Sequence, residues 1–347
     1  MISFFLLRIL TYCKRYSVSF LATVALVSLI FVGGRAQEPD EVIKTDTSLV
    51  QLNVGVVDRQ GHAITSLSQG DFVVYEDGVR RPIEHFESTG APFSLVLLLD
   101  MSGSTVNFRQ QIRSAALRFL DALGPDDRVA VIQFNGKGVK TLFGFSTDRR
   151  RTAYAITDLA NGAGETPLYE ALKYSLRELD REGKRRKAIV VLTDGIDTQA
   201  RKADRELVQK APDSQVSTVI RAEAYSQLNT VLTNADRLGV TVFPLALPSG
   251  DPKRLPLPDP LITAQYDAAR SRLQLLADRT GGRLNEIHSL DEMPKLYVEV
   301  AADLRSLYSI TYQPQNPARR DGKWREIRIE VAHADLVART KPGYYAR

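Results

Sequence analysis

The sequence predicts an α/β protein whose doubly wound, mostly parallel sheet carries a small flanking β-sandwich built from both chain ends. Between residues 92 and 305, apolar strands alternate with amphipathic helices, a pattern typical of an open sheet covered by helices on both faces. Short alternating strand patterns occupy 44–90 and 306–347. Each β segment is too small to bury a core alone, so we expect the two to pair.

The composition is that of a folded, globular chain. The 347 residues exceed the ~100–200 of an ordinary domain, and 44% are hydrophobic and 25% charged, which excludes a disordered chain. The single cysteine, Cys13, excludes an intramolecular disulfide and a cysteine-based metal site. Four of the 46 basic residues lie in 1–36, which contains no acid, so 42 basic residues face 41 acidic ones elsewhere. This balance does not favour nucleic-acid binding.

Residues 1–36 have the layout of a signal peptide. A basic stretch ending at Arg15 precedes the charge-free apolar run 18–32, and small residues lead to a cleavage position after Ala36. An uncleaved membrane anchor is the alternative, because residues 1–10 are also largely apolar. Either way, we expect the rest of the chain to be exported to the periplasm, the cell envelope or the medium. The protein would contact a membrane only through residues 1–36, if this segment is not cleaved.

The elements follow in order. Residues 48–86 alternate as strands, 93–100 is an apolar run expected of a strand buried on both faces, and 107–123 is an amphipathic helix ended by Gly124 and Pro125. Further strands are expected at 128–134, 141–145, 188–193, 240–247, 283–287, 307–312, 324–331 and 336–345. Further helices are expected at 149–159, 166–181, 214–236, 264–279 and 290–305.

Polar side chains stand where several of these strands end. Asp100 closes the first buried strand and begins the motif Asp-x-Ser-x-Ser with Ser102 and Ser104. Asp194 follows strand 188–193, and Thr166 lies in the loop before the helix led by Pro167. Open α/β sheets bind ligands at the carboxyl ends of their strands, so we expect these oxygen atoms to converge there.

These residues resemble the von Willebrand factor type A domain with its metal-ion-dependent adhesion site. The resemblance covers about 93–305, and the strand segments on either side resemble a bacterial exported subgroup of that family. It implies a divalent cation held by five residues, namely Asp100, Ser102, Ser104, Thr166 and Asp194. It also implies that the three hydroxyls ligate directly, that the carboxylates act partly through water, and that an Asp or Glu of a protein partner completes the shell.

The donor set suits a hard cation. Mg²⁺ prefers six oxygen ligands and keeps some waters, and Mn²⁺ or Ca²⁺ would also accept such a set. Only two of the five donors are charged, so the site would roughly neutralise a dication and leave one coordination position electrophilic. A carboxylate from a partner protein fits that position.

Ordinary structural roles compete with this interpretation. Ser102, Ser104 and Thr166 could cap helices, and Asp194 could belong to a plain turn. We expect Glu165 and Asp197, beside the site, and the basic runs 149–151 and 184–187 to be solvated. The long segment 201–239 could select a partner, cover the site or pack on the sheet flank.

The leading expectation is a non-enzymatic, exported binding protein. The sequence contains no Gly-x-Ser-x-Gly elbow, P-loop or Gly-x-Gly-x-x-Gly motif, and the four histidines show no metal-binding spacing. Two alternatives stay open. One is a metal-assisted hydrolase that activates a bound water; the other is a structural module of the cell envelope whose metal site is vestigial.

Overall fold

The structure, a computed structural model, describes residues 49–346 except 160–161, 184, 213–214, 217, 250, 253–255, 258, 290–291 and 317–320. The expected signal peptide 1–36 lies outside the described residues. Within the described part of the chain, no helix combines the length and apolar character needed to cross a membrane.

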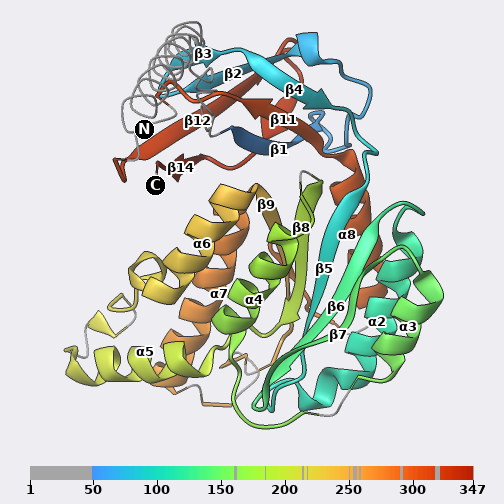
Figure 1. The fold of residues 1–347 in the computed structure, drawn as a ribbon. Helices are drawn as coiled ribbons and strands as arrows, with labels where there is room; N and C mark the ends of the chain where they lie inside the picture. The colour runs from blue at the N-terminus through green and yellow to red at the C-terminus, as the bar shows by residue number, and fades with distance from the viewer. Residues whose placement is uncertain are drawn as a thin grey trace, which may run out of the picture. The chain divides into compact units, whose positions relative to one another are not determined.

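A six-stranded sheet forms the centre of the α/β part (Figure 1). Its order is β10 (Asn285–Glu286), β9 (Val240–Ala246), β8 (Arg186–Thr193), β5 (Phe93–Asp100), β6 (Arg128–Asn135) and β7 (Gly138–Ser146). All neighbours are parallel except β6 and β7. Every residue of β5 is buried, as its unbroken apolar run predicts. The mixed α/β fold class is therefore confirmed.

Helices cover both faces of this sheet. One face packs against α2 (Arg109–Ala122), α3 (Arg149–Thr157) and α8 (Met293–Ser306). The other packs against α4 (Leu168–Asp180), α6 (Ser226–Leu238) and α7 (Pro260–Thr280), with α5 (Thr198–Lys210) beside α7. Figure 1 shows α2 and α3 on the side of the sheet opposite α4.

Strands from both ends of the chain form two antiparallel sheets that share one core. The first has the order β13 (Val337–Arg339), β1 (Val50–Val57), β11 (Tyr308–Tyr312) and β4 (Ile83–Glu87). The second has the order β14 (Gly343–Tyr345), β12 (Trp324–Val331), β2 (Phe72–Glu76) and β3 (Val79–Arg81). Because β1 pairs with β11 and β2 with β12, neither chain end forms a sheet alone.

The segment 201–239 differs from the prediction of one helix over 214–236. The helix α6 begins only at Ser226, after a short 3-10 turn at Ala222–Ala224. Its buried side chains, Leu228, Val231, Leu232 and Ala235, have helical spacing and pack on the sheet. Among the described residues between α5 and α6, no comparable stripe precedes them. This part of the segment therefore packs on the sheet flank.

Arg186, in the basic run 184–187, is not solvated, which corrects that expectation for this residue. Arg186 is 1% exposed and donates hydrogen bonds to the carbonyl oxygens of Ala91 (3.0 Å) and Leu304 (3.3 Å). Its guanidinium carbon lies 4.0 Å from the ring centroid of Phe93. Burial lowers the pKa of Arg186 to about 10. The side chain is buried because it satisfies carbonyls at the end of α8 and in the linker before β5.

Candidate metal centre

Asp100 is fully buried at the carboxyl end of β5. One carboxylate oxygen accepts a hydrogen bond from the backbone N–H of Ser102 (3.0 Å), and the other accepts one from the hydroxyl of Thr193 (2.7 Å). Burial and the neighbouring charge of Asp194 raise the pKa of Asp100 to about 7, although these hydrogen bonds oppose the shift. The two carboxylates thus lie close enough to repel each other.

The two serines of the motif lie together beyond this aspartate. Their Oγ atoms are 3.1 Å apart; Ser102 is buried and Ser104 is exposed. The chain between them and α2 is fixed by Thr105, whose hydroxyl donates to the carbonyl oxygen of Asp100 (2.8 Å). Because α2 begins only at Arg109, neither serine caps it, which removes the simplest structural role for this pair.

Asp194 follows β8, the strand beside β5. Its Oδ1 accepts a hydrogen bond from the backbone N–H of Ile196 (3.0 Å), whereas its buried Oδ2 has no hydrogen-bond partner among the described residues. Burial raises the pKa of Asp194, against the opposing influence of the Ser104 hydroxyl and the cation of Arg270. A buried carboxylate oxygen without a partner is costly, and a cation would compensate it.

Thr166 lies in a loop that is tied to the motif through its backbone. The N–H of Gly103 donates to the carbonyl oxygen of Gly164 (3.3 Å), and Thr166 is 5% exposed. Its N–H donates to the hydroxyl of Thr198 (2.8 Å). Pro167, not Thr166, occupies the cap position of α4. Among the described residues, the Thr166 hydroxyl makes no hydrogen bond to the other four candidate ligands. The interactions within those four join Ser102 to Asp100 and Ser104, and Asp194 to Asp100 and Ser104.

The two acidic neighbours of the site have different roles. Glu165 is exposed and lies 3.3 Å from the amine of Lys202, as expected of a solvated side chain. Asp197 is only 4% exposed, which corrects the expectation for it. It caps α5 by accepting hydrogen bonds from the N–H groups of Gln199 and Ala200, both at 2.9 Å. These bonds oppose the burial of its charge without outweighing it, since burial raises the pKa of Asp197.

Two residues that the sequence did not single out also reach the site. The hydroxyl of Ser249, after β9, donates to the carbonyl oxygen of Ser104 (2.6 Å). From α7, Arg270 donates to the carbonyl oxygen of Asp194 (2.6 Å) and to that of Leu247. Neither has a motif or a regular spacing relative to Asp100, so no sequence signal pointed to them.

A cavity of about 320 Å³ lies beside Thr166. Tyr225 and Gln227, at the start of α6, line it together with Glu165 and Tyr169. The ring centroids of the two tyrosines are 5.0 Å apart. The segment 201–239 therefore also contributes side chains next to the candidate centre.

The side chains present fit a hard divalent cation. Two buried carboxylates with raised pKa values, one of them with an unpartnered oxygen, lie beside two serine hydroxyls. In the described residues no group of three or more His, Cys, Asp or Glu side chains could hold a metal, so hydroxyls have to supply part of the shell. Such an oxygen-only, weakly charged set suits Mg²⁺ better than Zn²⁺.

Comparison with known proteins finds a family model that matches part of the chain. Residues 95–196 match the family model described as von Willebrand factor type A domain. No curated protein matches the chain.

Several solved structures are similar. An aerotolerance-related membrane protein of Bacteroides fragilis has 16% identity and a TM-score of 0.41, over 60% of this chain and 98% of its own. The von Willebrand factor domain of the type V pili tip protein Mfa5 from Porphyromonas gingivalis has 12% identity and a TM-score of 0.44, over 62% and 95%. A von Willebrand factor type A protein of Catenulispora acidiphila has 12% identity and a TM-score of 0.43, over 87% and 75%.

Proposed function

We propose that this protein is an exported, non-enzymatic binding protein that holds Mg²⁺, or Mn²⁺ or Ca²⁺ in its place, and grips an acidic side chain of a partner protein. The metal would be held by Asp100, Ser102, Ser104, Thr166 and Asp194. The von Willebrand factor type A match over residues 95–196 supports a binding role, and the export rests on the sequence of residues 1–36.

The unpartnered Oδ2 of Asp194 carries the proposal. It is buried beside a second carboxylate, and folding would not leave this arrangement uncompensated. A dication balances the two negative charges, after which the metal still attracts one more anionic ligand. Because Ser104 is exposed while Asp100 and Asp194 are buried, the open position would face solvent on the serine side.

The hydrolase alternative requires a general base near the metal. Asp100, whose pKa lies near 7, has a suitable proton affinity. However, it is fully buried and both of its oxygens already accept hydrogen bonds, from Ser102 and Thr193. It is therefore poorly placed to take a proton from water. Metal-dependent turnover of ester, phosphate or peptide substrates that disappears in Asp100→Ala would overturn the binding proposal.

Calorimetric titration with Mg²⁺ tests the metal site. Wild type should release or absorb heat in a saturable, one-site manner, and about 100 Kd of Mg²⁺ should stabilise it by about 2.7 kcal/mol. Asp194→Asn should lose both effects. Glu165→Gln, an exposed neighbour outside the ligand set, should keep both. Absence of heat and of thermal stabilisation in wild type would favour a structural module with a vestigial site.

Partner capture tests the second half of the proposal. Wild type immobilised in Mg²⁺ should retain a protein from a native envelope extract, and EDTA should release it. Asp194→Asn should retain none, whereas Glu165→Gln should behave as wild type. Retention that is equal with and without EDTA would show that the metal takes no part in binding.

A further inference from the structure

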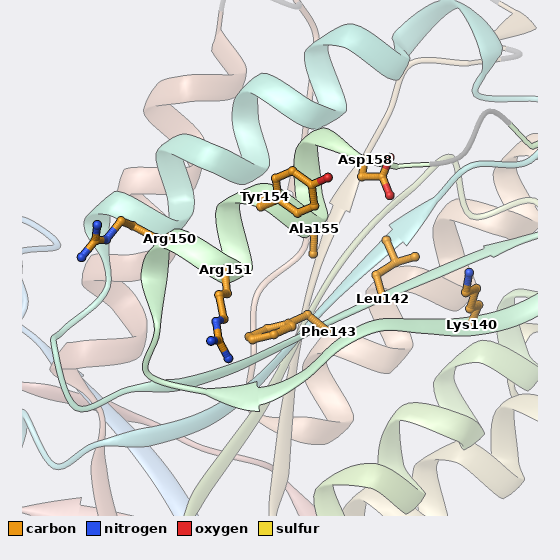
Figure 2. A pocket seen from close by; sticks show the side chains of 8 residues that line it. All are labelled: Lys140, Leu142, Phe143, Arg150, Arg151, Tyr154, Ala155 and Asp158. Carbon is orange, nitrogen blue, oxygen red and sulfur yellow. The ribbon is translucent and has the colours of Figure 1, made fainter.

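A second cavity lies at the edge of the sheet, between β7 and α3 (Figure 2). Its volume is about 480 Å³, within the range of small ligand sites. The strand supplies Lys140, Leu142 and Phe143, and the helix and its end supply Arg150, Arg151, Tyr154, Ala155 and Asp158. None of these residues belongs to the candidate metal centre.

Irregular pairing of β7 with β6 shapes the floor of this cavity. The register shifts between Thr141 and Phe143 and again before Ser146, so β7 carries extra residues relative to β6. Thr141 contacts Tyr174 of α4 on the opposite face of the sheet (3.0 Å), whereas both Leu142 and Phe143 line the cavity. In a regular strand, consecutive side chains would point to opposite faces. The bulge therefore places two consecutive apolar side chains under α3.

The charges of the cavity are predominantly positive. Three cations, Lys140, Arg150 and Arg151, face one acid, Asp158. Arg151 has only a weak, exposed pairing with Asp148 at 3.5 Å. In the part of the chain that the structure describes, neither Lys140 nor Arg150 makes an ion pair. The cavity thus offers cations that a bound anion could engage without breaking a strong internal contact.

The cations are also spread along the cavity. Figure 2 shows Arg150 and Lys140 at opposite ends, with Leu142, Phe143 and Tyr154 between them. Tyr154 is 73% exposed, which is high for an aromatic residue and typical of a side chain that becomes covered in a complex. A ligand that matches this order carries negative charges at both ends and an apolar group in the middle.

We propose that this cavity is a docking site for an extended acidic segment of a partner protein, in which an apolar side chain is flanked by Asp or Glu residues. The apolar side chain would contact Leu142, Phe143 and Tyr154, and the carboxylates would pair with Lys140 and Arg150. Binding would rely on side chains rather than on strand addition, because bulges and an edge lysine disfavour the pairing of a further strand with β7. The site is independent of the proposed metal centre.

Fluorescence polarisation tests this proposal with labelled peptides Gly-Glu-Glu-X-Glu-Glu-Gly, where X is Phe, Leu or Ala, and with a Phe peptide whose four Glu are Lys. All titrations are run in EDTA, so that the metal centre cannot contribute. The Phe or Leu peptide should bind saturably, and the Ala and Lys peptides should bind at least ~10-fold more weakly. The double variant Lys140→Glu/Arg150→Glu and the single variant Tyr154→Ala should each weaken binding by a similar factor.

The matched control is Arg118→Glu, which changes an exposed cation on α2 outside the cavity. It should bind the peptides as wild type does. Equal weakening in this control would reduce the effect to general charge attraction and overturn the proposal. So would failure of both the Phe and Leu peptides to bind wild type at concentrations up to about 1 mM, or binding that needs Mg²⁺ and is lost in Asp194→Asn. The last outcome would assign the peptide to the metal centre instead.

Discussion

Asp100 and Asp194 place two negative charges in the interior, at the ends of the neighbouring strands β5 and β8. An interior that excludes water strengthens their repulsion, so at least one of them gains affinity for a proton or another cation. The stability of the metal-free protein should therefore depend on pH through these two carboxyl groups.

The free energy of unfolding in EDTA should fall as the pH rises from about 4 to about 7. The folded-state pKa of Asp100, about 7, lies above the ordinary value of 3.8, so the folded state holds this proton more tightly than the unfolded state. The stabilisation that this proton provides is complete when the pH is below the ordinary pKa, and it is lost as the pH rises through the folded-state pKa. Its size is on the order of a few kcal/mol, since one pKa unit corresponds to ~1.4 kcal/mol.

Urea unfolding of wild type and Asp100→Asn at several pH values checks this expectation. The variant should lose much less stability over the same interval, because asparagine does not ionise; its Oδ1 can accept from the Ser102 N–H and its Nδ2 can donate to the Thr193 hydroxyl oxygen. Saturating Mg²⁺ should also flatten the wild-type profile. Parallel profiles for the two proteins would contradict the assignment.

Single residues differ in how far the sequence predicted them. The proximity of Asp100 and Asp194 follows from the rule that parallel strands end at one edge of a sheet. The burial of Arg186 does not follow, because its partners are the carbonyl oxygens of Ala91 and Leu304, which only the folded chain brings near. Asp197 caps α5 through N–H groups two and three residues further along the chain, but its low exposure depends on the surrounding fold. Ser249 and Arg270 reach the site from distant elements, so tertiary packing alone reveals them.

At the scale of elements, the loop that ends at Thr166 is held by close backbone contact with another loop. The N–H of Gly136 donates to the carbonyl oxygen of Ala163 (3.0 Å). A Cβ atom on Gly136 would lie 2.5 Å from that oxygen and 2.8 Å from the nitrogen of Glu165. Both atoms belong to the backbone, so the loop itself would have to move.

Gly136→Ala should therefore destabilise the protein by ~1–3 kcal/mol and weaken Mg²⁺ binding, because it displaces the segment that carries Thr166. Thermal unfolding and calorimetry measure the two effects. Gly144→Ala is the control, since a Cβ atom there meets nothing within 4 Å. A Gly136→Ala protein with unchanged Mg²⁺ affinity would show that the loop position does not matter to the metal.

The amino ends of the neighbouring strands β5 and β6 are joined by Glu182, which follows α4. Its carboxylate accepts hydrogen bonds from the hydroxyl of Ser94 (2.7 Å) and the guanidinium of Arg128 (2.7 Å), at the starts of β5 and β6. Burial alone would raise the pKa of Glu182, but these two partners outweigh it and lower the pKa. The carboxylate thus stabilises the fold while it is ionised.

Glu182→Gln should cost about 2 kcal/mol at pH 7. The folded-state pKa of Glu182 lies below the ordinary value of 4.5. The stabilisation by the ionised carboxylate is therefore present above pH 4.5 and disappears as the pH falls through the folded-state pKa. The difference between wild type and variant, measured by urea unfolding, should shrink toward pH 3. Glu170→Gln, an exposed control, should change little at either pH.

Element positions were mostly predictable, because amphipathic spacing and apolar runs directly reflect the packing of helices and strands on a core. The start of α6 and the bulges of β7 were not. The expected helix over 214–236 began too early, because the helical spacing of buried side chains starts only at Leu228. A bulge leaves no periodic signal in nine residues, so the exposure of Leu142 and Phe143 to one cavity could not be read from the strand.

At the scale of the whole molecule, a polar contact in the sandwich joins the two ends of the chain. Glu76 is 1% exposed and accepts hydrogen bonds from the hydroxyls of Tyr312 (2.8 Å) and Tyr344 (2.9 Å). It also accepts one from the N–H of Gln315 (3.1 Å). All three donors lie more than 230 residues away along the chain, as the separations of 236, 268 and 239 show.

Glu76→Ala should destabilise the protein by ~3 kcal/mol or more, because it leaves several buried donors without an acceptor. Glu76→Gln should cost less, since the amide can accept from one donor and donate to a hydroxyl. Chemical denaturation of both variants measures the difference. Equal stability of Glu76→Ala and wild type would mean that water replaces the carboxylate at no cost.

The joining of the two chain ends was predictable, because neither β segment could bury a core alone. The pairing order was not, since no turn sets the register between strands such as β1 and β11, which lie about 250 residues apart in the sequence. Only the completed fold shows that β11 lies between β1 and β4.

The chain enters the α/β part through the linker before β5 and leaves it directly from α8 into β11, and both connections run to the same sandwich. A force between a ligand bound at the candidate metal centre and the sandwich would therefore be divided between these two covalent connections. Neither connection would bear the whole force. Arg186 links the two connections, because it donates hydrogen bonds to the carbonyl oxygen of Ala91 in the linker before β5 and to that of Leu304 at the end of α8.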